Sequence, residues 1–321
     1  MGFRHELNGR IASGMNCSVV IPVYRGADTL EMLVERLGKV LPQLGASYEV
    51  VLVNDGSPDD SWAVITRLAE RHAWVRGIDL MRNYGQHNAT LCGVRAANHE
   101  VVFTMDDDLQ NLPEEMPKLL AKLNEGFDVV YGVARKRRQS WWKSLFSGLV
   151  KRTIAWVMGL RSVRDIGAFK VFRADLRKAF DTFHGPDVLL DVLLSWGTTR
   201  FASVPVEESP RAQGASNYDF IKLVKVSLLV LTSYTTLPLR LASVMGFLFT
   251  FVGLLILLYV LLTYFSAGSV PGFPFQASII AVFSGAQLFA LGIIGEYLAR
   301  LFERTGGRKP YAIGRTTKER G

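Results

Sequence analysis

Apolar residues in the first half of the chain gather in short runs that amphipathic segments separate. Five runs have the length and composition of buried strands: residues 17–23, 49–53, 75–80, 101–105 and 127–132. Between them, apolar positions recur at helical spacing over residues 29–41, 61–72, 86–98 and 114–124. Continuous apolar strands that alternate with helices are typical of a parallel sheet covered by helices on both faces. The pattern therefore predicts a doubly wound, Rossmann-like α/β domain.

The second half has a different pattern, with two long apolar runs at about 237–265 and about 275–298. From Leu241 to Gly295 the chain contains no Asp, Glu, Lys, Arg or His. Each run exceeds the roughly 20 residues that a membrane-spanning helix needs, which makes a buried core hairpin the weaker interpretation. The break at 266–274 is rich in Gly and Pro and predicts a tight turn. We therefore expect a domain over 1–235, a two-helix transmembrane hairpin within 236–302 and a basic tail over 303–321.

Basic residues flank the two apolar runs and are absent from the turn between them. Lys222, Lys225 and Arg240 precede the first run, and Arg300, Arg304, Arg308 and Lys309 follow the second. By the positive-inside rule, both ends of the hairpin lie in the cytoplasm. The first 16 residues are polar and show no signal peptide, and the two cysteines lie in apolar contexts that suit reduced thiols. The expected location is the cytoplasmic (inner) membrane, with residues 1–235 in the cytoplasm.

The positive net charge of the chain favours anionic binding partners. The net charge is +8, and part of it lies in the run Arg135–Arg138. Anionic lipid or phosphate is the expected partner, and the absence of a nucleic-acid motif argues against nucleic acid. Over about 140–160, apolar residues that include Trp141 and Trp142 recur at helical spacing with cations opposite. Core packing can explain such a stripe, but Trp at one end and a cationic face favour a helix that lies in the membrane interface.

Three carboxylates and an amide directly follow the fourth strand, in the segment Asp106-Asp107-Asp108-Leu109-Gln110. The carboxyl edge of a parallel sheet is where open α/β folds bind ligands. Strand-like alternation would put Asp106 and Asp108 on the same side. With Gln110 they offer hard oxygen ligands suited to Mg²⁺ or Mn²⁺. An acidic turn that caps the next helix is the plain alternative.

Two other strand ends carry groups suited to a nucleotide. The second strand is followed by Asn54-Asp55-Gly56-Ser57, and the first ends in Pro22-Val23-Tyr24. Asp55 can accept hydrogen bonds from the N–H groups of a base, against which the ring of Tyr24 can lie. Asn-Asp-Gly-Ser is also an ordinary turn composition. Its place on the same sheet edge as the acidic segment favours a nucleotide diphosphate site.

These segments, together with the run Arg82-Asn83-Tyr84-Gly85-Gln86-His87, resemble the motifs of family-2 glycosyltransferases with the GT-A fold. The two apolar spans, the second closing in Gly295-Glu296-Tyr297-Leu298, are similar to those of the polyprenyl-phosphate glycosyltransferases in that family. Within this group the run 82–87 is most similar to the undecaprenyl-phosphate formamido-arabinose transferases. The bactoprenol glucosyltransferases and dolichol-phosphate mannose synthases are more distant. The resemblance covers nearly the whole chain.

The resemblance implies a role for each matching residue. For the donor it implies Pro22, Tyr24, Asp55, Gln86, Asp106, Arg211 and Ser216, and for the metal Asp106, Asp108 and Gln110. For the acceptor phosphate it implies Arg135, Arg152, Asp165 and Arg173. Asp106, Asp108 and Arg135 would carry the catalysis. Gly26 stands where the family commonly has an acid, and Asn217 where a lysine is usual.

The implied activity is the inverting transfer of a sugar from a nucleotide diphosphate, expected to be UDP, to undecaprenyl phosphate or another polyprenyl phosphate. The product would be a lipid-linked sugar for cell-envelope glycan or lipid A modification. The second pKa of a phosphate monoester is about 6, so this acceptor is largely a dianion at neutral pH. We therefore expect no protein side chain to act as general base.

Two other functions share some of these features. A processive polysaccharide synthase would have the same kind of domain, but the chain lacks a Gln-x-x-Arg-Trp motif and two spans make a poor polymer channel. A non-catalytic nucleotide-sugar binder, or a component of a lipid transporter, would share the spans. The uncharged stretch from Leu241 to Gly295 lacks the ionisable residues that mark a transport pathway. The residues leave open whether the chain works alone or as a homo-oligomer.

Overall fold

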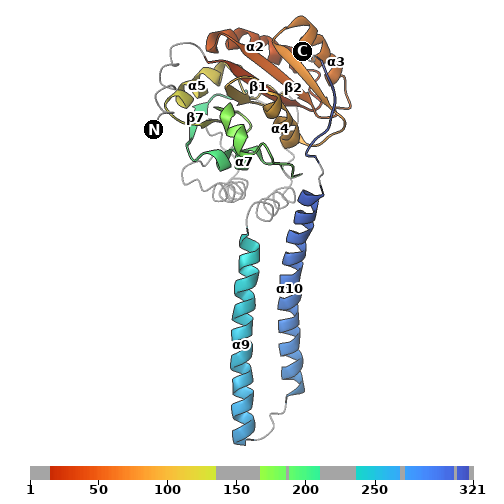
Figure 1. The fold of residues 1–321 in the computed structure, drawn as a ribbon, viewed down its shortest axis with the longest axis vertical. Coiled ribbons are helices and arrows are strands. Elements are labelled where there is room, and N and C mark those ends of the chain that lie inside the picture. Colours follow the sequence, from red (N-terminus) through yellow and green to blue (C-terminus); the bar gives the residue numbers. More distant parts are fainter. Residues whose placement is uncertain are drawn as a thin grey trace. The chain divides into compact units, whose positions relative to one another are not determined.

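The computed structural model describes residues 15–134, 167–185, 188–209, 236–267, 272–306 and 309–317. The chain divides into two compact units, residues 1–223 with 308–321, and residues 224–307. The first unit is built on a sheet covered by helices, and the second consists of two long helices (Figure 1).

Eight strands in the described part of the chain form one sheet, in the order β7-β5-β6-β4-β1-β2-β3-β8. Their bounds are β1 Cys17–Val23, β2 Tyr48–Asn54, β3 Val75–Leu80, β4 Val101–Thr104, β5 Val129–Ala134, β6 Lys170–Arg173, β7 Phe201–Val206 and β8 Ile313–Thr316. Strands β4, β1, β2 and β3 are parallel neighbours, as the continuous apolar runs predict. Strand β6 runs antiparallel to β4 and β5, and β8 runs antiparallel to β3. The sheet is therefore mixed, and the carboxyl ends of β4, β1 and β2 lie side by side.

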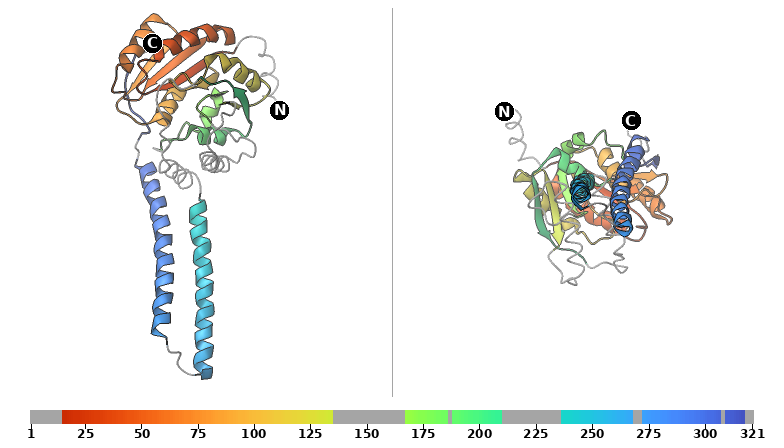
Figure 2. Two further views of the ribbon diagram at one scale, coloured as in Figure 1. Left: turned by 180° about the vertical axis from the view of Figure 1, so that it is seen from behind. Right: turned by 90° about the horizontal axis from the view of Figure 1, so that it is seen from below.

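Helices cover both faces of this sheet, which Figure 2 shows from behind. The α-helices are α2 Leu30–Leu44, α3 Ser61–Arg71, α4 Gln86–Ala96, α5 Met116–Asn124 and α7 Leu190–Gly197, with 3-10 turns η2 Pro113–Glu115 and η3 Ala174–Ala179. Helices α2, α3 and α5 bury their apolar residues in one cluster with Val19, Ile21 and Leu52. Helix α4 packs on the opposite face, where a Cβ on Gly93 would lie 2.3 Å from Val20 Cγ1. This close approach holds α4 tightly against β1.

The second unit is a pair of helices, α9 Leu237–Ala267 and α10 Phe273–Thr305. Both are long and apolar enough to cross a membrane. Their large apolar side chains are exposed along their length, for example Phe247, Leu262 and Leu288. Exposed surfaces of this kind suit lipid and not water. The two predicted spans are thus observed as helices, each somewhat longer than its apolar run.

Small residues bring the two helices together. Phe249 and Phe283 meet edge to face with ring centroids 5.8 Å apart. A Cβ on Gly253 would lie 3.3 Å from Cζ of Phe283, so the glycine makes room for that ring. Close packing over small residues is how helices associate where burial from water gives no driving force.

The segment after α10, where we expect a basic tail over 303–321, contains a strand in its described part. Helix α10 continues to Thr305, and Ile313–Thr316 forms the edge strand β8. The N–H of Met81 donates to the carbonyl of Ala312, and the N–H of Thr317 donates to the carbonyl of Gly77. The described part of the tail therefore belongs to the first unit. It pairs the open edge of β3, an edge that a protein otherwise has to protect.

Candidate functional site

The carboxyl ends of β4, β1 and β2 gather the main sequence-predicted groups on one edge of the sheet. Tyr24 follows β1, Asp55 follows β2, and the acidic segment follows β4. Gln86 opens α4, whose first turn reaches the same edge, because its Nε2 donates to Asp106 Oδ1 over 2.5 Å. Pro22 is buried within β1, beyond the last residue that pairs with β4, so its missing N–H leaves no bond to that strand unmade.

The three aspartates lie past the end of β4, which stops at Thr104. Strand alternation therefore does not set their directions, contrary to the expectation for Asp106 and Asp108. Asp108 accepts hydrogen bonds from the backbone N–H and the side-chain amide of Gln110. Leu109 has a left-handed φ of 61° while its side chain packs against the core. Such a backbone is uncommon for a leucine, and strain of this kind concentrates at functional sites.

Asp107 has a different environment from its two neighbours. Its Oδ2 accepts a hydrogen bond from the N–H of Tyr24 over 3.2 Å. Burial raises the pKa of the Asp107 carboxyl to about 7. The bond from Tyr24 opposes the rise, and the charges of Asp106 and Asp108 add to it. Sequence reasoning expected Asp107 to point away from Asp106 and Asp108 and Asp107→Ala to keep most of its activity, whereas the structure links Asp107 to the end of β1.

Asp55 is 2% exposed, and both of its oxygens have backbone partners. Oδ1 accepts from the N–H of Tyr84 over 2.7 Å and Oδ2 accepts from the N–H of Gly85 over 2.8 Å. Burial raises the pKa of Asp55, and these two bonds oppose that rise. The residue therefore holds the loop before α4 in place. A contact of its carboxylate with a nucleobase stays a prediction.

A second set of contacts connects Asn54 with the C-terminal strand β8. Asn54 Nδ2 donates to Asp79 Oδ1 over 2.7 Å, and Arg315 Nε donates to Asp79 Oδ2 over 2.8 Å. Arg315 also lies over the ring of Trp62, with 4.9 Å between its Cζ and the ring centroid. The parts of Asp79 and Arg315 were not predicted, since only the pairing of β8 with β3 brings Arg315 to Asp79.

On the other side of β4, a buried charged cluster lies at the same edge. Lys170 opens β6 and pairs in register with Thr104, the last residue of β4. Its Nζ donates to Asp191, and the hydroxyl of Tyr131 donates to the same Asp191 oxygen over 2.9 Å. Burial, followed by the charge of Asp191, raises the pKa of Tyr131 well above its ordinary value. All three side chains are buried.

Arg173 does not lie at this edge. Because β6 is antiparallel to β4, Arg173 pairs in register with Val101, at the opposite end of β4 from Thr104. Its Nε lies 3.7 Å from Asp128 Oδ1, and Asp128 also binds Arg200. The structure thus brings Lys170, and not Arg173, to the candidate site.

Comparisons with known proteins identify the family. Residues 18–175 match the model of glycosyl transferase family 2. The chain is 37% identical over 303 residues to the undecaprenyl-phosphate 4-deoxy-4-formamido-L-arabinose transferase of Proteus mirabilis, covering 92% of each chain. It is 33% identical to the enzyme of the same name from Klebsiella pneumoniae, covering 94% of each. The chain belongs to glycosyltransferase family 2. The resemblance drawn from the sequence motifs is confirmed.

Solved structures agree with the fold of this glycosyltransferase. Glucosyl-3-phosphoglycerate synthase of Mycobacterium tuberculosis is similar with a TM-score of 0.50 and 18% identity, over 71% of this chain and 81% of that one. A second structure of that synthase, in complex with Mn²⁺, UDP-glucose and phosphoglyceric acid, gives a TM-score of 0.51 over 68% of this chain and 78% of that one. At this identity the likeness shows the GT-A fold alone. The predicted fold class and the assignment as an enzyme are both confirmed.

The donor set of this glycosyltransferase fits a divalent cation. Asp106 and Asp108 offer carboxylate oxygens and Gln110 offers an amide oxygen, which are the hard ligands that Mg²⁺ and Mn²⁺ prefer. Within the described residues, no group of three or more His, Cys, Asp or Glu side chains is gathered as a metal cluster. A metal here would therefore depend on the two carboxylates, Gln110 and oxygens of the substrate.

Several predicted residues fall outside the described ranges. These are Arg135, Arg152 and Asp165 on the acceptor side, Arg211 and Ser216 on the donor side, and the interfacial helix at about 140–160. Their roles stay predictions.

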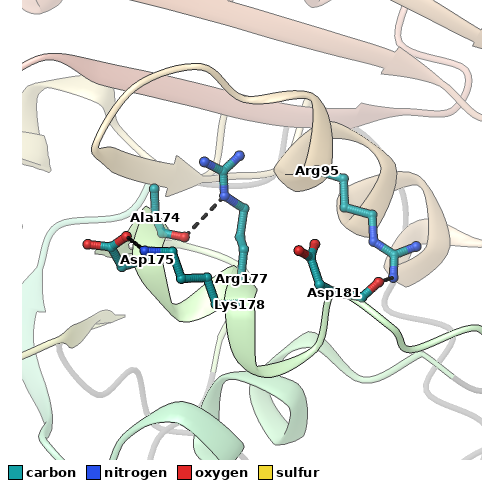
Figure 3. Close-up of a pocket in the computed structure, with 6 residues that line it drawn as sticks. All are labelled: Arg95, Ala174, Asp175, Arg177, Lys178 and Asp181. Carbon is teal, nitrogen blue, oxygen red and sulfur yellow. Dashed lines mark hydrogen bonds and ion pairs between the residues drawn. The ribbon is translucent and has the colours of Figure 1, made fainter.

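A pocket at the other end of α4 and β4 is separate from this site. It is lined by Arg95, Ala174, Asp175, Arg177, Lys178 and Asp181 (Figure 3). Its two arginines are engaged with backbone carbonyls: Arg177 binds those of Val94 and Ala97, and Arg95 binds that of Phe183. These bonds attach η3 and the following loop to the end of α4. The pocket is accounted for by this structural role.

Proposed function

We propose that this glycosyltransferase moves a sugar from a UDP-sugar to a polyprenyl phosphate, undecaprenyl phosphate being the expected carrier, at the cytoplasmic face of the inner membrane. The observation that carries the proposal is the 37% identity, over 92% of both chains, to a relative named as an undecaprenyl-phosphate sugar transferase. The similarity extends over more of the chain than the family-2 match at 18–175 covers.

The donor side of the proposal rests on the edge formed by β4, β1 and β2. Asp106, Asp108 and Gln110 would hold a divalent metal, which neutralises charge on the departing nucleotide diphosphate when bound. Tyr24 is 46% exposed at the end of β1, which leaves its ring accessible to a nucleobase. Asp55 supports this surface by holding the Tyr84–Gly85 loop.

The acceptor side fits a nucleophile that needs no deprotonation. In the proposed step a phosphate oxygen of the lipid forms a bond to the anomeric carbon, and the bond from that carbon to the nucleotide diphosphate breaks. The nucleotide leaves with the electron pair, and the anomeric centre is inverted. Asp191 lies on this side, but its carboxylate is bound by Lys170 and Tyr131. Taking up a proton there would break a buried ion pair, which disfavours Asp191 as a base.

The membrane side rests on α9 and α10. A hairpin of two spans returns the chain to the side on which it entered, and the strand that follows it, β8, pairs with β3 of the catalytic unit. The start of α9 and the end of α10 would therefore lie on the side of that unit, the cytoplasmic side by the positive-inside rule.

The test is a transfer assay with the purified full-length protein, Mn²⁺ or Mg²⁺, undecaprenyl phosphate and a panel of UDP-sugars that includes UDP-formamido-arabinose. Mass spectrometry of the lipid fraction should find one sugar joined to one lipid phosphate. Polymeric product would instead indicate a processive synthase. Nucleotide-sugar binding without any lipid product would indicate a non-catalytic binder.

A further inference from the structure

The loop between β1 and α2 is held by four consecutive backbone N–H groups, each of which donates to a side chain. Tyr24 donates to Asp107 Oδ2 over 3.2 Å, Arg25 to Ser57 Oγ over 3.2 Å, Gly26 to Ser61 Oγ over 3.0 Å and Ala27 to Asp59 Oδ2 over 3.4 Å. Three acceptors come from the segment after β2, and the fourth comes from the acidic segment after β4. Arg25 has a left-handed φ of 59°, a conformation that such bonds must maintain.

Asp107 and Gly26 fit each other closely. A Cβ at Gly26 would lie 2.5 Å from Asp107 Oδ2 and 3.1 Å from Cγ1 of Val23. Gly26 does not have a left-handed φ, so space and not backbone conformation excludes a side chain there. The Asp107 carboxylate occupies the volume that a side chain at position 26 would need.

We propose that Asp107 is a positioning residue for the donor. Through the N–H of Tyr24 it fixes the β1–α2 loop, and Gly26 is the complementary position that admits its carboxylate. This inference rests on the proposed function, because it takes this edge as the nucleotide-sugar site. Tyr24 is half exposed, so packing of its side chain does not fix its ring. The hydrogen bond from the Tyr24 N–H to Asp107 restrains the residue instead. Asp107 stands between Asp106 and Asp108, so one short segment positions both the diphosphate side and the base side of the site.

A double-mutant cycle in the full-length protein tests this pairing. The variants are Gly26→Ala, Asp107→Ala and the double variant. The measurement is the affinity, with Mn²⁺, for whichever of UDP, GDP and dTDP the wild type binds best. Gly26→Ala should weaken binding by at least roughly tenfold, because its methyl group displaces the carboxylate. The double variant should bind about as well as Asp107→Ala alone, since residues in direct contact are not additive. The KM for the lipid acceptor should change far less than the KM for the donor.

Gly197→Ala is the matched control, because its Cβ would lie 3.0 Å from Leu176 Cδ2 in a part of the unit away from the site. It should lower the melting temperature and leave nucleotide affinity unchanged. Wild-type nucleotide affinity in Gly26→Ala, or additive losses in the double variant, would overturn the inference. So would an Asp107→Ala variant that binds nucleotide as tightly as the wild type. A wild type that binds nucleotide but forms no lipid product would count against the proposed function alone.

Discussion

At the residue scale, Asp108 gives the most direct test of the metal site. Its side chain is partly exposed in a segment beyond β4, where its carboxylate accepts hydrogen bonds from the neighbouring Gln110. Asp108→Ala should therefore fold normally. Transfer should fall by at least about 100-fold, the size of effect seen when charge stabilisation of a transition state is lost.

Activity and melting temperature should be measured together, across a range of Mn²⁺ concentrations. Asp175→Ala is the control, because Asp175 is an exposed aspartate at η3 that pairs with Lys178. It should keep both quantities near wild type. Full turnover of Asp108→Ala in excess metal would show that Asp108 is not a ligand.

Gly56 is a position where the backbone leaves no room for a side chain. It has a left-handed φ of 60°, and a Cβ there would lie 2.5 Å from both the carbonyl carbon of Arg82 and the nitrogen of Asn83. These are backbone atoms of the loop that Asp55 holds, so they cannot move without disturbing it. Gly56→Ala should cost about 2–4 kcal/mol of unfolding free energy, more than backbone strain alone, and should weaken donor binding.

Gly85→Ala is the matched control for Gly56→Ala. Gly85 also has a left-handed φ, of 92°, but a Cβ there would have no neighbour within 4 Å. The control should therefore show only the strain of an unfavourable φ, about 1–2 kcal/mol. Equal losses in chemical denaturation for the two variants would rule out the steric cause.

The residues that the sequence reveals are those that lie directly after a strand, such as Tyr24, Asp55 and Asp106, because strand ends meet at one edge of a parallel sheet. Those it misses act through contacts that only the folded chain creates. Asp107 is recognised because its carboxylate fills the space beside Gly26. Asp79 is recognised because strand pairing brings Arg315 within hydrogen-bond distance of it. The departure at Gly26, where the family commonly has an acid, now has a neighbour that accounts for the small residue.

At the element scale, the C-terminal strand β8 and strand β3 are joined to the site through Asp79. Asp79→Ala would leave the buried amide of Asn54 without the acceptor of its 2.7 Å hydrogen bond. Leaving a buried polar group unpaired costs about 1–3 kcal/mol. Arg315→Ala would remove the other partner but keep the Asn54–Asp79 bond, and Arg315 is 63% exposed. An exposed ion pair contributes at most about 1 kcal/mol.

Thermal denaturation of the two variants should therefore show a larger loss for Asp79→Ala. A larger loss for Arg315→Ala would mean that attachment of β8, and not the pairing of Asn54, is what Asp79 provides.

Glu49 on β2 connects three elements at the amino edge of the sheet. It is 3% exposed and accepts hydrogen bonds from Ser18 on β1 and from the backbone and side chain of Asn98 after α4. Burial works to raise its pKa, but these bonds and the charge of Arg76 hold the pKa of Glu49 below its ordinary value. A lowered folded pKa means that the ionised form stabilises the fold at neutral pH. That stabilisation is lost as the pH falls through about 4 and below.

Glu49→Gln should accordingly reduce the unfolding free energy at pH 7 by about 1.5–3 kcal/mol, the range for hydrogen bonds to a charged group. The difference from wild type should shrink as the pH falls below about 4. Denaturation curves of the wild type and of Glu49→Gln at several pH values measure this difference in unfolding free energy. Glu35→Gln, on the exposed side of α2, should behave as wild type throughout. A deficit that stays constant down to acid pH would point to lost packing and not lost charge.

The elements that could be predicted are those whose own residues carry the pattern. Strands β1 and β3 have the predicted bounds: β1 is an almost continuous apolar run, and β3 carries buried Val75, Ile78 and Leu80. Strand β8 could not be predicted, because Ile313–Thr316 is exposed throughout and is a strand only by its pairing with β3. The four-residue β6 is equally hard to recognise. Its antiparallel direction explains why a role inferred by resemblance for Arg173 falls at the wrong end of the strand.

At the scale of the whole molecule, the two-helix hairpin is inserted, in chain order, between two segments of the catalytic unit. Residues 1–223, before the hairpin, and residues 308–321, after it, both belong to the unit that contains the sheet. Loss of β8 pairing would therefore expose the edge of β3. An even number of spans lets a strand that follows the membrane segment return to the side of the membrane on which the rest of its sheet lies.

Labelling of single cysteines gives the test of this topology. The native Cys17 and Cys92 are buried, and burial raises the pKa of each thiol to about 12, so neither should react in the folded protein. Labelling of the protein therefore reports the accessibility of a newly introduced cysteine alone. Gly272→Cys, at the start of α10, should react with an impermeant maleimide in intact spheroplasts. Lys309→Cys, exposed just before β8, should react only after the membrane is opened, because β8 must reach β3 on the cytoplasmic side. Labelling of Lys309→Cys in sealed spheroplasts would contradict both the topology and the pairing of β8 with β3 in the cell.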